Sequence, residues 1–388
     1  MTPAARYGAA IEILDAITAG TPAEQQLTRW ARGARYAGSK DRAAVRDIVF
    51  DVLRRRASSA WLGGGETGRA LVLGLLRGQG ADPEAVFTGQ GHAPTPLEPS
   101  EHASPALSDA PRAVQLDLAD WALGALDRDH GDAATAIAEA LRDRAPVGLR
   151  TSLRHGTRDD LIATLLASGH DATPHDAAPG ALVLPSGTRG LHLTEAYLSG
   201  QFELQDPGSQ GLVARCPAHS GTRILDYCAG GGGKALALAD AHELDITAHD
   251  IEPKRMKDLP ERARRAGVSI QIAEEIPSDA QFDGIICDVP CTGSGAWRRA
   301  PDARWRTTPE QLQALCTTQA EIVDECVPMI APGGWLAYMT CSLFAAENDD
   351  QAAAILVRHP HLSSEVVWST TPLDGTDGFY LHVFRAPS

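Results

Sequence analysis

The chain has 388 residues, of which 43% are hydrophobic, and its formal net charge at pH 7 is −15. That length predicts two or three domains with ordinary globular cores. The charge excludes a surface that is basic throughout, although not a local basic site for nucleic acid, and no membrane span is expected because no run of about 18 apolar residues occurs.

Residues 1–90 are predicted to form a small helical domain. Val45, Ile48, Val49, Val52 and Leu53 follow the i, i+3, i+4, i+7, i+8 spacing of a buried helix face. This domain contains no cluster of residues that is typical of a catalytic site. Residues 91–114 are predicted to be a linker or a long irregular loop, since the stretch from 92 to 111 contains five prolines and few apolar side chains.

Residues 115–215 are predicted to form a small α+β subdomain that leads into the core of the chain. Helix-like patterns lie at 114–126, 133–141 and 159–168. Short apolar runs at 146–153 and 181–184 are typical of strands.

From residue 216 to residue 388 the pattern alternates between strands and helices. Strands are predicted to begin at 224–225 and to lie at 246–248, 268–272, 282–287 and 335–339, with an edge strand at 379–384. Helices are predicted after a glycine loop through residue 238, and at 253–266, 309–330 and 347–358. Such alternation predicts a doubly wound, mostly parallel sheet of the α/β class.

The glycine loop after the first of these strands is a candidate binding feature. It consists of Cys228, Ala229, Gly230, Gly231, Gly232, Gly233 and Lys234. Glycines let backbone N–H groups approach a ligand closely, and Asp250 ends the next strand roughly 20 residues later, where a carboxylate can bind a ribose hydroxyl. The spacing favours a nucleoside-type cofactor over a plain tight turn, and the residues at 228 and 235 do not fit a triphosphate-binding loop.

Two cysteines and a carboxylate follow two strands of the predicted sheet. Asp288 and Cys291 come after the strand at 282–287, and Cys341 comes after the strand at 335–339. Because loops at the carboxyl ends of parallel strands line the crevice of an open α/β sheet, we expect these side chains over one crevice. A thiolate that adds to C6 of a pyrimidine makes C5 nucleophilic toward a sulfonium methyl group, and a second thiol or other base must then assist removal of the C5 proton. Asp288 is placed to hydrogen-bond N3 and the exocyclic amine of the ring.

The seven cysteines indicate neither a disulfide framework nor a metal site. They contain no CxxC pair and no Cys/His cluster. Cys216, Cys287, Cys316 and Cys326 are interpreted as small buried hydrophobes. Because residues 1–10 also lack the apolar stretch of a signal peptide, a reducing, cytoplasmic setting is expected.

Cationic residues gather in two stretches of the chain. One lies between Arg29 and Arg56, and the other comprises Arg298, Arg299, Arg304 and Arg306. A run of charge is most often a solvated helix face, but the second stretch follows the Cys291 loop in the sequence. It is therefore the candidate for contacts with nucleic-acid phosphates.

Three motifs carry a family resemblance. They are Asp288-Val-Pro-Cys291-Thr-Gly-Ser-Gly, Arg298-Arg299-x-Pro301-Asp302-x-x-Trp305 and Thr340-Cys341-Ser342-x-x-x-x-Glu347-Asn348, with Gln205–Gln210 and Asp377–Tyr380 as flanking matches. They resemble the signatures of the Sun/Nop-type RNA cytosine-C5 methyltransferases, and the bacterial RsmB-like branch most of all. The resemblance is specific over about 200–388 and looser over 115–200. Over 1–90 it rests on Gly38–Arg42 and a helical pattern similar to the NusB-like domain of that branch.

The resemblance implies a Rossmann-like class I methyltransferase core with a seven-stranded, mostly parallel sheet, an N-terminal helical NusB-like RNA-binding domain at 1–90 and a small α+β linker subdomain. It implies that Cys341 is the nucleophile at C6 and that Cys291 assists release of the methylated product. Asp288 and Lys234 would orient and polarise the base. The loop from Cys228 to Lys234 would bind S-adenosyl-L-methionine, with Asp250 on the ribose. The full implied cofactor site also includes Arg255, Glu274 and Asp288.

The chain departs from the family pattern at two points of the implied cofactor site. The family loop usually reads Cys-Ala-Ala-Pro-Gly-Gly-Lys, whereas Gly230 and Gly231 stand in the middle here, and the acidic residue after the third strand is Glu274 or Glu275 instead of Asp. The implied activity is C5 methylation of cytosine in RNA, with 16S ribosomal RNA as the expected substrate, by a cytoplasmic monomer that uses no metal and no membrane. The same chemistry on transfer RNA, and a non-catalytic RNA-binding or ribosome-assembly factor, remain as alternatives. The two site thiols argue against a non-catalytic factor, because binding alone does not require them.

Overall fold

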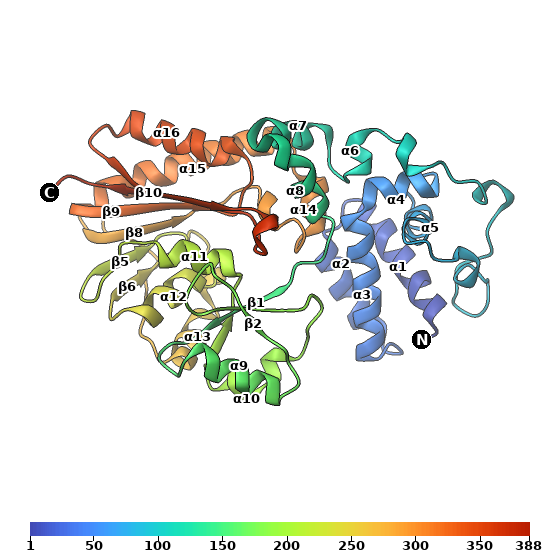
Figure 1. The fold of residues 1–388 in the computed structure, drawn as a ribbon, viewed down its shortest axis with the longest axis horizontal. Helices are drawn as coiled ribbons and strands as arrows, with labels where there is room; N and C mark the ends of the chain where they lie inside the picture. The colour runs from blue at the N-terminus through green and yellow to red at the C-terminus, as the bar shows by residue number, and fades with distance from the viewer. The chain divides into compact units, whose positions relative to one another are not determined.

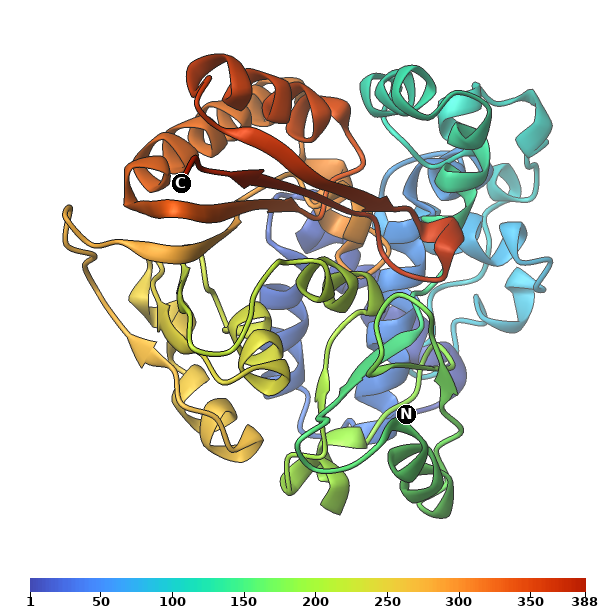
Figure 2. The same ribbon diagram turned by 60° about the vertical axis from the view of Figure 1, so that its left-hand side comes forward.

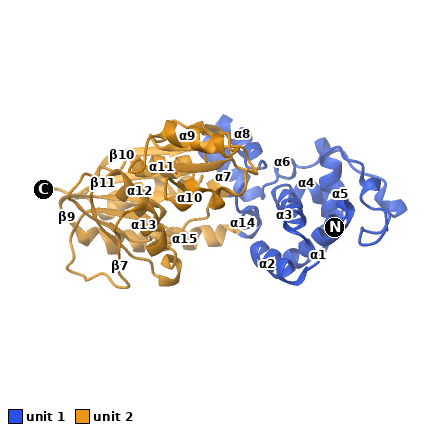
Figure 3. Cartoon of the chain, turned by 90° about the horizontal axis from the view of Figure 1, so that it is seen from below, with its two compact units in different colours: residues 1–143, 297–306 blue, residues 144–296, 307–388 orange.

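The computed structural model describes all residues from Met1 to Ser388, which divide into two compact units (Figure 3). Residues 1–143 and 297–306 form the first unit, and residues 144–296 and 307–388 form the second. The division differs from the predicted boundaries, because the segment 91–143 belongs to the helical unit together with a piece of chain from far downstream. None of the helices combines the length and the apolar character that crossing a membrane requires.

The first unit is helical. Its helices are α1 (Pro3–Thr18), α2 (Ala23–Gly33), α3 (Ser39–Arg54), α4 (Arg56–Gly63), α5 (Gly68–Gly78), α6 (Arg112–Gln115), α7 (Asp120–His130), α8 (Ala134–Ala140) and α14 (Pro301–Arg306). The predicted apolar face of α3 is buried with Ile13 and Leu14 of α1 and Leu71 of α5. Threonine caps α1 and α5, where the hydroxyl of Thr2 accepts from Ala5 N and that of Thr67 from Ala70 N, each at 3.2 Å.

Glycines in this unit serve a close helix contact. At Gly74 of α5 a Cβ would lie 1.8 Å from the carbonyl oxygen of Ser59 in α4. The two helices therefore approach each other closely at a position that no larger residue fits. The proline-rich segment after α5 is irregular, as predicted, and is held in place by Arg69, which donates to the carbonyl oxygens of Thr95 and Pro96 and to the carboxylate of Glu101.

The second unit contains a seven-stranded sheet in the order β10-β11-β9-β8-β5-β6-β7 (Figure 1). Its strands are β5 (Arg223–Asp226), β6 (Asp245–Ala248), β7 (Gln271–Ile272), β8 (Phe282–Asp288), β9 (Ile330–Thr340), β10 (Ser363–Thr370) and β11 (Phe379–Arg385). The five strands from β9 to β7 are parallel, and β11 lies antiparallel between β9 and β10. The predicted mostly parallel, doubly wound sheet is thus confirmed.

The predicted edge strand at 379–384 is wrong in its position. It forms β11, an interior strand that pairs with β9 on one side and β10 on the other. No strand was predicted at β10, because five of the eight residues in Ser-Ser-Glu-Val-Val-Trp-Ser-Thr are polar and seven of the eight are exposed or only partly buried. Such a strand carries no long apolar run, and it is the true edge of the sheet.

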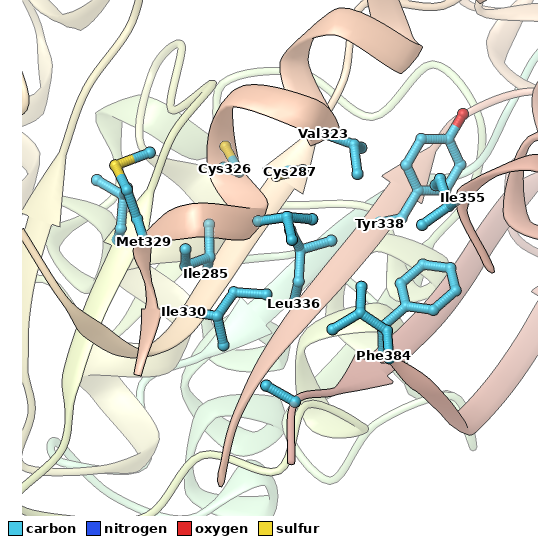
Figure 4. Close-up of a cluster of buried hydrophobic side chains, with 14 of the residues drawn as sticks. Ile285, Cys287, Val323, Cys326, Met329, Ile330, Leu336, Tyr338, Ile355 and Phe384 are labelled. Atoms are coloured by element: carbon cyan, nitrogen blue, oxygen red, sulfur yellow. The ribbon is translucent and has the colours of Figure 1, made fainter. Parts of the chain in front are cut away.

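Helices cover both faces of this sheet (Figures 1 and 2). They are α11 (Pro207–Ala214), α12 (Gly233–Ala241), α13 (Leu259–Ala266), α15 (Pro309–Cys326) and α16 (Asp349–Arg358). Val323 and Cys326 of α15 and Ile355 of α16 pack against Ile285, Leu336 and Tyr338 of the strands in one core cluster (Figure 4). On the opposite face, Leu212 of α11 and Leu238 of α12 pack against Ile224 and Ile286.

A second, smaller sheet in this unit has the order β2-β3-β1-β4 and is antiparallel. Its elements are β1 (Val147–Thr151), α9 (Arg158–Ala167), β2 (Thr173–Pro174), β3 (Ala181–Leu184), α10 (Glu195–Leu198) and β4 (Phe202–Leu204). Arg150 of β1 is buried and lies 2.9 Å from Asp240 of α12, which also accepts from the Ser152 hydroxyl at 2.6 Å. Buried charge pairs and hydrogen bonds therefore fasten the small sheet to the large one.

Candidate active site

The ends of β8 and β9 bring the two predicted site thiols together. The strands pair in parallel with Asp288 opposite Met339, so the loops after them leave the same edge of the sheet. The Sγ atoms of Cys291 and Cys341 lie 3.4 Å apart, and both residues are half-buried. The hydrogen bond with Cys341 and then burial raise the pKa of the Cys291 thiol well above its ordinary value. Cys291 is therefore protonated at neutral pH, as a proton donor or a resting thiol would be.

Lys234 and Asp288 form an ion pair beside these loops. Lys234 lies in the first turn of α12, and its Nζ is 2.5 Å from Asp288 Oδ2. Burial opposes the charge on Lys234, but the neighbouring Asp288 outweighs it and raises the pKa of the lysine. The cation therefore persists at neutral pH. The pair exists because β5, which leads into α12, and β8 are neighbours in the sheet.

Asp226, the last residue of β5, is a buried carboxyl group of the same edge. Its side chain is 1% exposed, and no other side chain donates a hydrogen bond to either oxygen. Burial, followed by the negative charge of Asp288, raises the pKa of Asp226 to about 7. A carboxyl group that is part protonated near neutral pH costs less to bury than a full carboxylate.

The glycine loop between β5 and α12 is fastened to the end of β6. Gly230 N donates to Asp250 Oδ2 at 2.8 Å, and Arg255 pairs with the same carboxylate at 3.0 Å. Gly232 has φ +74°, and a Cβ there would lie 2.3 Å from a methyl group of Leu259. The loop therefore needs glycine at this position.

This loop is open to the close approach of a nucleoside cofactor. Its four consecutive glycines, residues 230–233, leave the backbone without side chains at the carboxyl edge of a parallel sheet. Ile251, which follows Asp250, exposes 87% of its surface and gives an apolar face for a ring. Arg255 is half exposed, whereas the Asp250 carboxylate is buried and serves the loop itself. Glu274 is exposed after β7, which β6 separates from β5 in the sheet.

Sequence analysis placed Glu347 in a motif but gave it no role. The structure shows it as a fully buried carboxylate that accepts hydrogen bonds from the loops after both β8 and β9. The only sequence signal was an acidic residue five positions beyond Ser342, which does not indicate burial.

The prediction that the second arginine cluster contacts phosphates does not fit two of its members. Residues 297–306 belong to the first unit, not to the unit that holds Cys291. Arg304 is 1% exposed and donates to the carbonyl oxygens of Arg54, Asp117 and Leu141, and Arg298 is 5% exposed. Burial lowers the pKa of Arg304 to about 10, which leaves it charged at neutral pH. Arg304 thus ties segments of the helical unit together instead of facing a ligand, and the Arg298 side chain is buried. Arg306 is exposed and, with Arg299, keeps the predicted role as a proposal.

Replacing Arg304 with alanine should destabilise the first unit by about 3 kcal/mol or more, because three buried carbonyl oxygens lose their donor. Urea unfolding followed by circular dichroism measures the loss. The matched control is Arg306→Ala in the same helix, where a side chain 62% exposed has an ion-pair distance of 3.9 Å. The control should change stability by no more than about 0.5 kcal/mol. Equal effects of the two substitutions would contradict the structural role of Arg304.

Comparison with known protein families gives two matches. The family described as 16S rRNA methyltransferase RsmB/F matches residues 216–380, and the ferredoxin-like domain of RsmF/B-like methyltransferases matches residues 118–189. The second match covers the small sheet through β3, together with helices that precede it.

Curated relatives carry the name ribosomal RNA small subunit methyltransferase B. The protein of Xylella fastidiosa (strain 9a5c) is 32% identical over 349 residues, which are 82% of this chain and 83% of that protein. The protein of Enterobacter sp. (strain 638) is 32% identical over 247 residues, which are 62% of this chain but only 58% of that protein. The match thus spans little more than half of the Enterobacter protein.

Solved structures share the fold. PH0851 superposes with a TM-score of 0.78 over 99% of both chains at 18% identity. NSun6 from Pyrococcus horikoshii, solved with SFG, superposes with a TM-score of 0.63 over 70% of this chain and 99% of its own at 16% identity.

Proposed function

Because this chain belongs to the RsmB/RsmF family of 16S ribosomal RNA methyltransferases, whose methyl donor is S-adenosyl-L-methionine, we propose that it methylates C5 of a cytosine in small-subunit ribosomal RNA. The observation that carries the proposal is the pair of thiols at the ends of β8 and β9, with sulfurs 3.4 Å apart. A methyltransferase that acts on an amine or hydroxyl needs no thiol nucleophile, whereas an unreactive ring carbon does.

The proposed reaction begins with Cys341. Its thiol loses its proton to water, the sulfur bonds to C6 of cytosine, and the C5–C6 π electrons move toward C5 and the N3 side of the ring. The Asp288 carboxylate is proposed to accept from the exocyclic amine, and from N3 once that nitrogen is protonated, while the Lys234 cation, 2.5 Å from Asp288, stabilises negative charge that develops there. S-adenosyl-L-methionine, when bound, supplies the methyl group that C5 accepts.

Release needs a second step with its own groups. The C5 proton must leave, the C5–C6 double bond must reform and the bond between C6 and the Cys341 sulfur must break. We assign assistance in this step to Cys291. Its thiol lies 3.4 Å from the departing sulfur and passes its proton to that sulfur, and the Cys291 thiolate so formed takes up the C5 proton. The glycine loop from Cys228 to Lys234, with Asp250 and Arg255, is the proposed holder of the cofactor.

The experiment that tests this function is bisulfite sequencing of RNA from a strain that lacks the gene. One cytosine of 16S ribosomal RNA should lose its methyl group, and the purified protein should restore it on the extracted RNA. Loss of methylation in transfer RNA alone would move the activity to that substrate. An unchanged methylation pattern in all RNA, together with no activity of the purified protein, would overturn the proposal.

Replacing Asp250 with alanine should weaken S-adenosyl-L-methionine binding by at least about tenfold, which corresponds to roughly 1.4 kcal/mol. The substitution removes the acceptor that holds Gly230 N and pairs with Arg255. Titration calorimetry measures the affinity, and Asp279→Ala, an exposed aspartate in the loop before β8, is the matched control. An affinity equal to that of the control would remove Asp250 from the cofactor site.

A further inference from the structure

Glu347 is a buried carboxylate that binds the residue after each site thiol. It is 0% exposed and lies in the short turn Ala345–Glu347, between β9 and α16. Its Oε1 accepts from Thr292 N at 2.8 Å, and its Oε2 accepts from the hydroxyls of Thr292 and Ser342, each at 2.5 Å. Thr292 follows Cys291 and Ser342 follows Cys341. One side chain therefore joins the two cysteine loops.

Further hydrogen bonds join the same two loops, and we call this contact between the Cys291 loop and the Cys341 loop the junction. The hydroxyls of Ser294 and Ser342 lie 3.1 Å apart, and Ser294 Oγ accepts from Leu343 N at 2.7 Å. Gly295 N donates to the carbonyl oxygen of Cys341 at 2.9 Å. The loops beyond β8 and β9 have left the sheet, so these bonds replace the strand ladder as the source of their alignment.

Helix α15 supports Glu347 from the side. Gln319 is 0% exposed, and its Nε2 donates to Glu347 Oε1 and to the carbonyl oxygen of Pro290, each at 3.0 Å. Both of these partners can only accept, so they fix which end of the Gln319 amide faces Glu347. The hydroxyl of Tyr338 in β9 donates to the carbonyl oxygen of Glu347 at 2.6 Å and lies 3.0 Å from Gln319 Oε1. Each oxygen of Glu347 thus receives two donors, and all four donors are neutral.

We propose that Glu347 is a positioning residue that holds the sulfurs of Cys291 and Cys341 in contact, and this inference rests on the proposed function of those thiols. An ionised carboxylate accepts at both oxygens, whereas a glutamine amide presents an N–H₂ group that cannot accept from the donors around it. Glu347→Gln therefore leaves the shape of the side chain unchanged, but its N–H₂ group faces neighbouring groups that also donate hydrogen bonds. The competing explanation, a buried group that only contributes stability, predicts no change in the alignment of the thiols.

The test measures thiol alignment without methyl transfer. Diamide oxidises two thiols to a disulfide: the sulfurs lose two protons and two electrons, and the azo bond of the reagent takes them up to become a hydrazine. Sulfurs that already lie 3.4 Å apart should join quickly. Mass spectrometry of peptides that contain Cys291 and Cys341 follows the rate of this particular disulfide in the full chain.

Glu347→Gln should slow disulfide formation by at least about tenfold, because the loops separate on average. Thr292→Val, which removes one hydroxyl donor and retains the backbone donor, should slow it by about threefold and keeps the test decisive if Glu347→Gln does not fold. The matched control is Glu321→Gln, an exposed carboxylate on the same helix as Gln319, which should oxidise at the wild-type rate. The proposal would be overturned if Glu347→Gln and Thr292→Val both formed the disulfide at the wild-type rate. If only Thr292→Val is soluble, a wild-type rate in that variant would overturn it.

A second readout separates this inference from the proposed function. With RNA as substrate, Glu347→Gln should lower kcat by about 100-fold at an unchanged KM for S-adenosyl-L-methionine, as expected when reacting groups are displaced by about 1 Å. A wild-type protein that methylates no RNA would refute the proposed function and leave the oxidation test standing. Loss of methylation with an undiminished oxidation rate would refute the positioning role alone.

Discussion

Replacing Cys341 with alanine is expected to lower methyl transfer to RNA by at least about 10⁴-fold, the scale on which enzymes lose activity without their nucleophile. In the proposed mechanism Cys291 assists only the later release step, so no other group is assigned the bond to C6. The variant should also form no covalent adduct with RNA on a denaturing gel. Transfer of labelled methyl groups at saturating RNA measures the rate.

The matched control for Cys341 is Cys316→Ala. Cys316 lies on α15 with its thiol directed to the carbonyl oxygen of Ala346, outside the proposed chemistry. This variant should retain activity within about threefold, provided that its unfolding midpoint is unchanged. Residual activity of Cys341→Ala near that of the control would exclude Cys341 as the nucleophile.

Replacing Cys291 with alanine should trap the enzyme on its substrate. Attack by Cys341 and one methyl transfer remain available, but elimination loses its assisting group, so turnover should fall by about 10²- to 10⁴-fold, the usual contribution of a general acid or base. A covalent protein–RNA complex should then accumulate and migrate slowly on a denaturing gel. Mass spectrometry should find the methyl group in the trapped RNA.

The two cysteine variants together decide the order of roles. An adduct trapped by Cys341→Ala and absent in Cys291→Ala would reverse the assignment. Methylation at the wild-type rate in both variants, without an adduct in either, would refute covalent catalysis altogether. The contact of 3.4 Å between the sulfurs makes either single-cysteine scheme sterically reasonable, and only the chemistry of the trapped species separates them.

The site could be predicted where it depended on strand order and on local pattern. The apolar runs of β8 and β9 end immediately before Asp288 and Thr340, so the common edge followed from the parallel sheet. The Lys234–Asp288 ion pair depends in addition on β5 lying next to β8, two segments about 60 residues apart, which no local pattern specifies. Asp288 was predicted from its place after a strand and Lys234 from the family resemblance, and their contact was found in the structure.

The main feature that could not be predicted from the sequence was the burial of charged groups. An arginine in a run of arginines is expected to be solvated, yet the partners of Arg304 are main-chain carbonyl oxygens, which leave no mark in the residue pattern. Glu347 is similar, because its donors are a backbone amide, two hydroxyls and a glutamine from three separate segments. In both cases the partners of the buried charge are neutral, and most of them lie far away in the sequence.

The first unit is assembled from two separate pieces of chain, and this affects how the protein is synthesised. Trp305 donates to the carbonyl oxygen of Leu53 at 2.6 Å and Arg304 to three carbonyl oxygens of residues 54–141, so the early piece is incomplete without residues 297–306. About 150 residues of the second unit are translated in between, which takes roughly 8–30 s at ordinary elongation rates. During that interval the nascent helical unit exposes unpaired carbonyl groups, so its final closure must follow the emergence of most of the methyltransferase sheet.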